Sequence, residues 1–113
     1  MKNQRVNVTP GAPKGHEVYG TLKTVFGTKI IEVHAGFYVS PDLRFSIYRR
    51  ANEHAETYAR GNWMIEDSNE RSFSDPIPTK REAFEALVEW QEYAAKQDAS
   101  RAVERAAIRA SRR

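Results

Sequence analysis

Three histidines, His16, His34 and His54, are the side chains of this sequence best suited to catalysis or metal binding. An imidazole changes its charge near neutral pH and ligates transition metals, so each could serve either role. The triplet His54-Ala55-Glu56 is half of the signature of zinc-dependent deaminases, but the chain lacks the cysteines of the other half. Nothing in the spacing of the three histidines brings them together. We therefore predict no catalytic residue, no metal site and no cofactor, and expect that the protein is not an enzyme.

Other catalytic signatures are missing from the sequence as well. The absence of cysteine excludes disulfides, thiolate catalysis and cysteine-ligated zinc. No serine lies in the context of a nucleophile elbow. No glycine-rich loop stands between an expected strand and an expected helix, where it would hold a phosphate. A small enzyme that uses His34 or His54 is kept as a third hypothesis, behind two that rest on binding.

Tyrosine and arginine side chains point to recognition instead of catalysis. Four tyrosines share the polar side of their expected strands with basic residues. The tyrosines are Tyr19, Tyr38, Tyr48 and Tyr58, and the basic residues are Lys23, Arg44, Arg50 and Arg60. Such a sheet face can stack unpaired bases, and the same residue types are enriched at the hot spots of protein interfaces. In a third interpretation, which stays open, these side chains form cross-strand pairs that only stabilise an exposed face of the sheet.

The elements that must position these residues begin with a sheet. Alternating apolar and polar residues predict strands at 17–26, 29–40 and 43–48, joined by turns at Gly27–Thr28 and Pro41–Asp42. A fourth strand is expected within 55–66, after a loop at 51–54, and a short fifth strand at 71–73. The residues of the second strand expected to face the core are Ile31, Val33, Ala35, Phe37 and Val39. The prediction is a four- to five-stranded antiparallel meander.

A capped amphipathic helix follows the sheet. Thr79 and Glu82 have the spacing of a capping box, and Pro76 and Pro78 precede them where no helical hydrogen bond is needed. One broad face of residues 79–95 is apolar and must be covered. Its members are Ala83, Phe84, Leu87, Val88, Trp90, Ala94 and Ala95, with Gln91 among them. The sequence therefore predicts an α+β fold in which this helix covers one face of the sheet.

Charge is segregated along the 113 residues, although the net charge is only +3. Both ends are basic: residues 1–15 carry three basic side chains and no acid, and residues 101–113 carry five arginines and one glutamate. Within the helix Glu82, Glu85, Glu89 and Glu92 fall on the side opposite the apolar face. Each charged surface is either a solvated face or a contact for a partner, with phosphate as one ligand of the arginines.

The arginines near the C-terminal end have the spacing of one helical stripe. They are Arg101, Arg105, Arg109 and Arg112. A single helix over 79–112 would measure about 51 Å, longer than a small sheet can cover. The helix therefore either breaks near Asp98–Ser100 or projects past the sheet. We expect a flexible arm at residues 1–15, a single α+β domain at 16–97 and an Arg-rich helical tail at 98–113.

The layout resembles that of small inhibitor proteins borne by phages and plasmids, including some anti-CRISPR proteins. The segment that carries this resemblance runs from Trp63-Met64-Ile65-Glu66-Asp67 to Pro78-Thr79-Lys80-Arg81-Glu82-Ala83. It contains no family-specific motif and transfers no functional residue. What the resemblance implies is a mode of action, the occlusion of a site on a large nucleic-acid-processing complex without chemistry.

The sequence thus favours a non-catalytic binding protein whose partner is a protein or a nucleoprotein complex. The alternative is a module that binds single-stranded nucleic acid through the Tyr/Arg sheet face and the basic tail. The residues expected to contact the partner are Tyr19, Tyr38, Arg44, Tyr48, Arg50, Tyr58, Glu85, Glu89, Glu92, Arg101, Arg105 and Arg109. No apolar run is long enough to span a bilayer, so we expect a cytoplasmic protein. A homodimer stays open.

Overall fold

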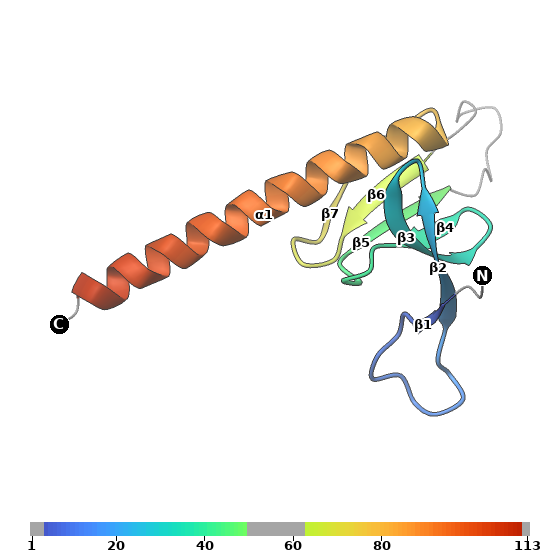
Figure 1. Ribbon diagram of the computed structural model, residues 1–113, viewed down its shortest axis with the longest axis horizontal. Coiled ribbons are helices and arrows are strands. Elements are labelled where there is room, and N and C mark those ends of the chain that lie inside the picture. The colour runs from blue at the N-terminus through green and yellow to red at the C-terminus, as the bar shows by residue number, and fades with distance from the viewer. Residues whose placement is uncertain (1–3, 50–62, 112–113) are drawn as a thin grey trace.

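The computed structural model describes residues 4–49 and 63–111, in which seven β-strands are followed by one long α-helix (Figure 1). The elements are β1 (Arg5–Asn7), β2 (Tyr19–Val25), β3 (Thr28–His34), β4 (Phe37–Val39), β5 (Phe45–Arg49), β6 (Trp63–Asp67), β7 (Ser72–Phe73) and α1 (Lys80–Ser111). The strands form one sheet in chain order, each antiparallel to its neighbours. The predicted α+β class with an antiparallel meander is therefore confirmed. The expected count of four to five strands is wrong.

The additional strands come from two segments of the sequence. Arg5–Asn7, inside the segment expected to be a flexible arm, pairs with β2 as an edge strand. The long strand expected at 29–40 is divided into β3 and β4 by a tight turn, in which Gly36 has a φ of 82°. Glycine adopts this left-handed conformation without steric cost, so the chain can reverse there. Each of the two segments thus adds one strand to the expected number.

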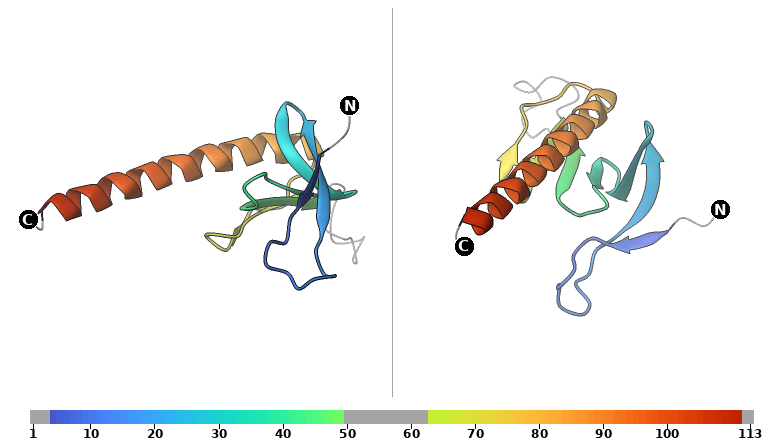
Figure 2. Two further views of the ribbon diagram at one scale, coloured as in Figure 1. Left: turned by 60° about the horizontal axis from the view of Figure 1, so that its bottom comes forward. Right: turned by 60° about the vertical axis from the view of Figure 1, so that its left-hand side comes forward.

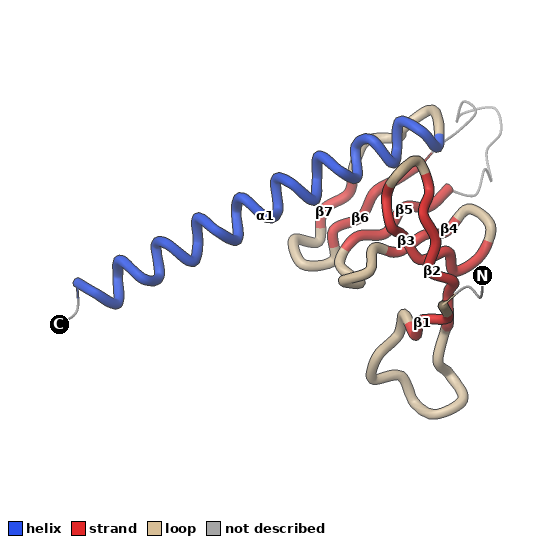
Figure 3. Tube along the Cα trace, viewed as in Figure 1, coloured by secondary structure: helices blue, strands red, loops and turns tan. Residues whose placement is uncertain are grey.

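Helix α1 begins as the sequence predicts. The backbone N–H of Glu82 donates to the Thr79 Oγ over 3.1 Å, which is the threonine half of the capping box. The helix then continues through Asp98–Ser100 without a break and ends at Ser111. At 1.5 Å per residue its 32 residues extend about 48 Å. Figure 3 shows that its second half projects past the sheet, so the projecting alternative is the one observed.

The core lies between the first half of α1 and one face of the sheet. Phe84 is its central ring, with its centroid 5.8 Å from that of Phe26 in the β2–β3 turn and 5.3 Å from that of Tyr38 in β4. The buried residues of this cluster are Ile30, Tyr38, Phe45, Ile47, Trp63, Ile65, Ala83, Phe84, Leu87 and Ala94. Full burial of each large apolar side chain contributes about 1.5–3 kcal/mol, so this cluster is the main source of stability.

The predicted sidedness of β3 and β4 is wrong. Tyr38, expected on the open face, is only 3% exposed and packs against Phe84 and Trp63. Ile30 of β3, which has the same even parity as Tyr38, is fully buried in the same cluster. Ile31 and Val39, expected to face the helix, pair with each other on the other side of the sheet, where they are also buried. The register shift between Glu32 and His34 is a bulge that interrupts the simple alternation.

Candidate functional site

The Tyr/Arg platform expected from the sequence is not assembled. Tyr38 lies in the core, and Tyr19 is exposed at the far end of β2, where the Arg5 guanidinium stands 4.7 Å from its ring. Tyr48 is half-buried and stacks on Phe37 with a centroid distance of 6.2 Å. Arg50 and Tyr58 lie outside the described residues. The described tyrosines of the expected platform, Tyr19, Tyr38 and Tyr48, are therefore spread over one end of β2, the core and the far face of the sheet.

Arg44, another described member of that platform, is engaged in an ion-pair cluster. Its Nε and Nη2 lie 3.0 Å and 3.1 Å from the two carboxylate oxygens of Asp67, a bidentate contact. Its Nη1 lies 3.4 Å from a carboxylate oxygen of Asp98 in α1, and its Nη2 lies 3.9 Å from one of Glu70. Arg101 approaches the same Glu70 to 3.1 Å. This cluster joins the sheet to the middle of α1.

The Arg44–Asp67 pair stays ionised at neutral pH. Burial alone would raise the pKa of Asp67, but the Arg44 guanidinium and the backbone N–H groups of Glu70 and Asn69 donate to the carboxylate and hold its pKa below the usual value. The hydrogen bond to Asp67 raises the pKa of Arg44. Both partners are therefore charged and mutually satisfied. Arg44 is held by Asp67 within the sheet and contacts α1 through the exposed Asp98, so it is not available as a cation for a ligand.

A groove lies beside this cluster, between α1 and the edge strand β7, and we call it the α1–β7 groove. Its volume is about 600 Å³. Its wall on the helix is made by Trp90, which is half-buried, and by Tyr93, which is 66% exposed. The remaining lining residues are Arg44, Asp67, Glu70, Ser72, Glu89, Ala94, Gln97 and Arg101. The groove thus combines aromatic surface with charged groups at its rim.

Sequence reasoning missed Trp90 and Tyr93 as site residues. Trp90 was assigned to the covered face of the helix, and Tyr93 was given no role. Both lie on the side of α1 that passes from its buried face toward its glutamates, so neither is fully covered by the sheet. Two large aromatic residues three positions apart at the border of an apolar stripe are the signal that would have identified this wall.

The second half of α1 lies in solvent. Residues 98–111 are all exposed, including Val103 at 69% and Ile108 at 53%. Both views in Figure 2 show this part of the helix extending away from the sheet. We call residues 99–111 the projecting half of α1. Apart from the exposed pair between Arg101 and Glu70, its helical state depends on intrinsic propensity and on its continuity with the anchored half.

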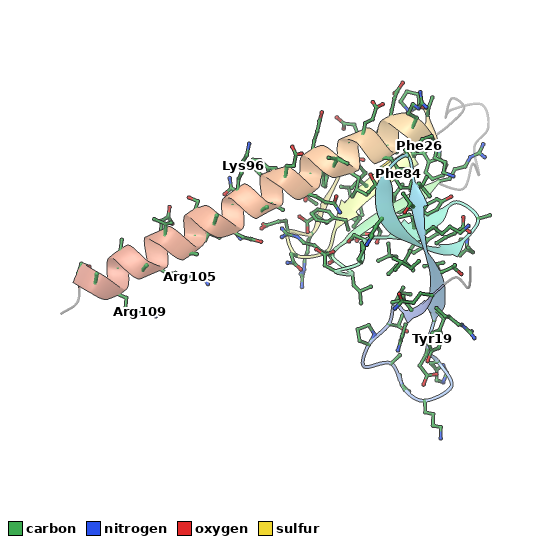
Figure 4. All side chains as sticks on the ribbon, viewed as in Figure 1. Tyr19, Phe26, Phe84, Lys96, Arg105 and Arg109 are labelled. Atoms are coloured by element: carbon green, nitrogen blue, oxygen red, sulfur yellow. The ribbon has the colours of Figure 1, made fainter. Side chains whose placement is uncertain are left out.

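The charged residues predicted for the helix lie at its surface. Glu85, Glu89 and Glu92 are exposed on the anchored half, and Glu89 also lines the groove. Arg105 and Arg109 are exposed on the projecting half, and neither forms an ion pair with any residue between 4 and 49 or between 63 and 111. Figure 4 shows both arginines on the lower side of α1 and Lys96 on the upper side. The helix therefore offers acidic and basic surfaces in separate places.

The histidines do not form a site in the described part of the chain. His16 and His34 are exposed, and the His34 ring stacks on Phe37 at 5.4 Å. His54 lies outside the described residues. Among the residues that are described, no group of three or more histidine, cysteine, aspartate or glutamate residues is placed to hold a metal ion. The described helix also lacks the long apolar stretch that crossing a bilayer requires.

Comparisons of the chain with models of protein families, with curated proteins and with solved structures found no match.

Proposed function

We propose that this chain is a non-catalytic binding protein that recognises a partner protein through the α1–β7 groove. The observation that carries the proposal is the aromatic wall of the groove, where Tyr93 is 66% exposed beside the half-buried Trp90. Tryptophan, tyrosine and arginine supply most of the binding energy at protein interfaces, above all beside pockets that exclude water. A side chain of the partner that enters this groove would bury both rings.

The charge around the groove supports a protein partner over a nucleic acid. Glu70 and Glu89 stand at its rim, and Asp67 lies within its lining. Of the two cations there, Arg44 is held by the nearly buried Asp67, and Arg101 forms an exposed pair with Glu70. Carboxylates at the rim repel a phosphate backbone, whereas they are ordinary features of the polar rim of a protein interface. A partner segment with an apolar anchor and a nearby basic group fits this pattern.

The proposal extends to inhibition. A small protein without catalytic groups can inhibit a partner by covering a site on its surface. Helix α1, with its 32 residues and a length of about 48 Å, enlarges the surface that a small sheet domain could cover. The layout resembles that of phage- and plasmid-borne inhibitors, which supports a partner that is part of a nucleic-acid-processing complex. The alternative of a single-stranded nucleic-acid module on the Tyr/Arg sheet face is not carried forward, because Tyr38 is buried and Arg44 is paired.

The experiment is affinity capture by the tagged full chain from a lysate of the organism that encodes it, with wild type and two variants compared. Tyr93→Ala removes an exposed ring of the groove, and Tyr19→Ala removes a 42% exposed ring of the same type at the far end of β2. We expect Tyr93→Ala to lower recovery of the partner at least tenfold, the effect of a hot-spot loss of about 1.4 kcal/mol or more.

Tyr19→Ala should recover the partner as wild type does. Circular dichroism of both variants checks that the fold is kept. We expect that it is, because both tyrosine side chains are exposed. Undiminished recovery by Tyr93→Ala would reject the groove as the contact. A loss confined to Tyr19→Ala would move the contact to the opposite end of the molecule.

A further inference from the structure

We propose that the projecting half of α1 binds the phosphate backbone of double-stranded DNA, with the helix in the major groove and Arg101, Arg105 and Arg109 as the phosphate contacts. This inference goes beyond the protein contact proposed above and does not depend on it. It concerns the projecting half of the helix and a different chemistry, and the two surfaces share Arg101, which also lines the α1–β7 groove.

The three arginines form one regular row. They are four residues apart, so each step along the helix advances about 6 Å and turns only about 40°. Figure 4 shows Arg105 and Arg109 on the same side of α1, away from Lys96. All three side chains are exposed. Arginine presents a planar fork of donors that matches phosphate oxygens, and the row places these forks along one line.

The shape of the projecting half suits the major groove of B-form DNA. That groove is about 12 Å wide, and an α-helix with its side chains is about 10–12 Å across. Residues 102–111 extend about 15 Å beyond Arg101, which pairs with Glu70, and residues 99–111 are all exposed. The left-hand view of Figure 2 shows the C-terminal end of the helix extending beyond the sheet. The many alanines of this half permit a close approach; they are Ala99, Ala102, Ala106, Ala107 and Ala110.

The charge of the projecting half favours a polyanion. Residues 99–111 contain three arginines and a single acid, Glu104. In the described chain Arg105 and Arg109 have no ion-pair partner. The 3.1 Å pair between Arg101 and Glu70 joins side chains that are 51% and 45% exposed. Exposed pairs contribute only about 0–1 kcal/mol, so a phosphate can replace Glu70 at little cost.

Two competing partners fit this face less well. An acidic protein would be expected to meet large aromatic anchors near the arginines, and the projecting half carries only alanines, Val103 and Ile108 as apolar residues. Duplex RNA has a major groove too deep and narrow for a helix to enter. The row of arginines on a slender, unobstructed helix therefore fits B-form DNA best.

The test is fluorescence anisotropy with a labelled DNA duplex of about 24 base pairs, titrated with the full chain from about 50 to about 200 mM salt. Three phosphate contacts predict an affinity that falls about 40-fold over this range. The triple variant Arg101→Gln/Arg105→Gln/Arg109→Gln should remove this binding. Glutamine is close to arginine in helix propensity, so circular dichroism should report an unchanged helix content.

A matched control separates the arginine row from net charge. Lys14→Gln/Lys29→Gln/Arg49→Gln removes the same charge from exposed positions of the sheet region and should leave the affinity within about twofold of wild type. Tyr93→Ala should likewise bind the duplex as wild type does, which keeps the outcome distinct from that of the proposed protein contact.

Four results would overturn the proposal. They are the absence of duplex binding at the lowest salt, an equal loss in the two triple variants, equal affinity for a polyglutamate chain of matched charge, and equal or tighter binding of an RNA duplex or of single-stranded DNA. The polyglutamate result would assign the arginine row to an acidic protein. An equal loss of affinity in the two triple variants would mean that the binding depends on the net charge of the protein and not on the arginine row.

Discussion

Replacement of Arg44 by alanine is expected to lower the free energy of unfolding by about 3 kcal/mol. The side chain of Asp67 is only 7% exposed, and its two carboxylate oxygens accept hydrogen bonds from Nε and Nη2 of Arg44 over 3.0 Å and 3.1 Å. Loss of one partner of a buried pair costs about 3–5 kcal/mol, because a charge is left buried without compensation. Asp67 would keep the backbone N–H groups of Asn69 and Glu70 at 3.0 Å and 3.4 Å, so the lower end of that range applies.

The exposed contacts of the same cluster contribute less. Asp98 is 60% exposed and lies 3.4 Å from Arg44, so Asp98→Asn should cost no more than about 1 kcal/mol. The double variant Arg44→Ala/Asp67→Asn removes the orphaned charge together with its partner. We expect it to be about 1–2 kcal/mol more stable than Arg44→Ala alone, since the penalty of the single variant comes from an uncompensated carboxylate.

Urea denaturation followed by tryptophan fluorescence measures these differences, with Trp63 and Trp90 as the probes. A loss of about 3 kcal/mol should also lower the Tm by roughly 10 °C in a chain of this size. The reasoning would be refuted if Arg44→Ala cost less than about 1 kcal/mol, or if Asp98→Asn were as destabilising as Arg44→Ala. Either result would mean that the Arg44–Asp67 pair, which joins the start of β5 to the end of β6, is not the main contribution of the cluster to stability.

Three further predictions concern the core and the acid response. Phe84→Ala should cost about 3–5 kcal/mol by denaturation, because the ring is 1% exposed at the centre of the core. Gly20→Ala should cost about 1–3 kcal/mol in the same assay, since a Cβ there would overlap the Ile31 Cγ2 and lie 2.9 Å from the Glu32 carbonyl oxygen. The lowered pKa of Asp67 predicts a contribution that is complete above about pH 4 and is lost as pH falls through the lowered value. The stability difference between wild type and Asp67→Asn should therefore shrink below that pH, and a constant difference would contradict the assignment.

The helix could be predicted because its determinants are local. A cap at Thr79 and an apolar stripe at helical spacing fix the start of α1 and its buried face, and Ala83, Phe84 and Leu87 are buried as expected. Whether the helix ends near Asp98 or continues could not be decided from spacing. The Arg44–Asp98 contact joins residues 54 positions apart in sequence and holds the middle of α1 on the sheet. Local patterns carry no record of such a contact.

The sheet was harder to predict, for reasons that Tyr38 illustrates. Alternation from Ile31 to Val39 suggests one core face, yet the sheet buries residues of both parities, Ile30 and Tyr38 against α1 and Ile31 and Val39 on the other side. In the described part of the chain no buried side-chain polar atom lacks a hydrogen-bond partner, so a residue with a polar tip is buried without penalty.

The candidate site depended on the same long-range information. The alternation of polar and apolar residues correctly separates Arg44 from the core residue Phe45. The ion-pair partner of Arg44, however, is Asp67, which lies 23 positions away in the sequence. Spacing along one strand could not show that the guanidinium is taken. Nor could it show that Trp90 and Tyr93 border a groove, because that groove exists only once β7 is placed beside α1.

Hydroxyl-radical footprinting of the captured complex would most directly test whether the α1–β7 groove is where a partner binds. The rate of side-chain oxidation reports exposure, and the free chain offers Tyr93 at 66%, Phe73 at 57% and Tyr19 at 42%. In the complex we expect Tyr93 and Trp90 to be oxidised several-fold more slowly than in the free chain, with Tyr19 unchanged. Unaltered oxidation of Tyr93 and Trp90, with protection elsewhere on the chain, would contradict the proposed contact.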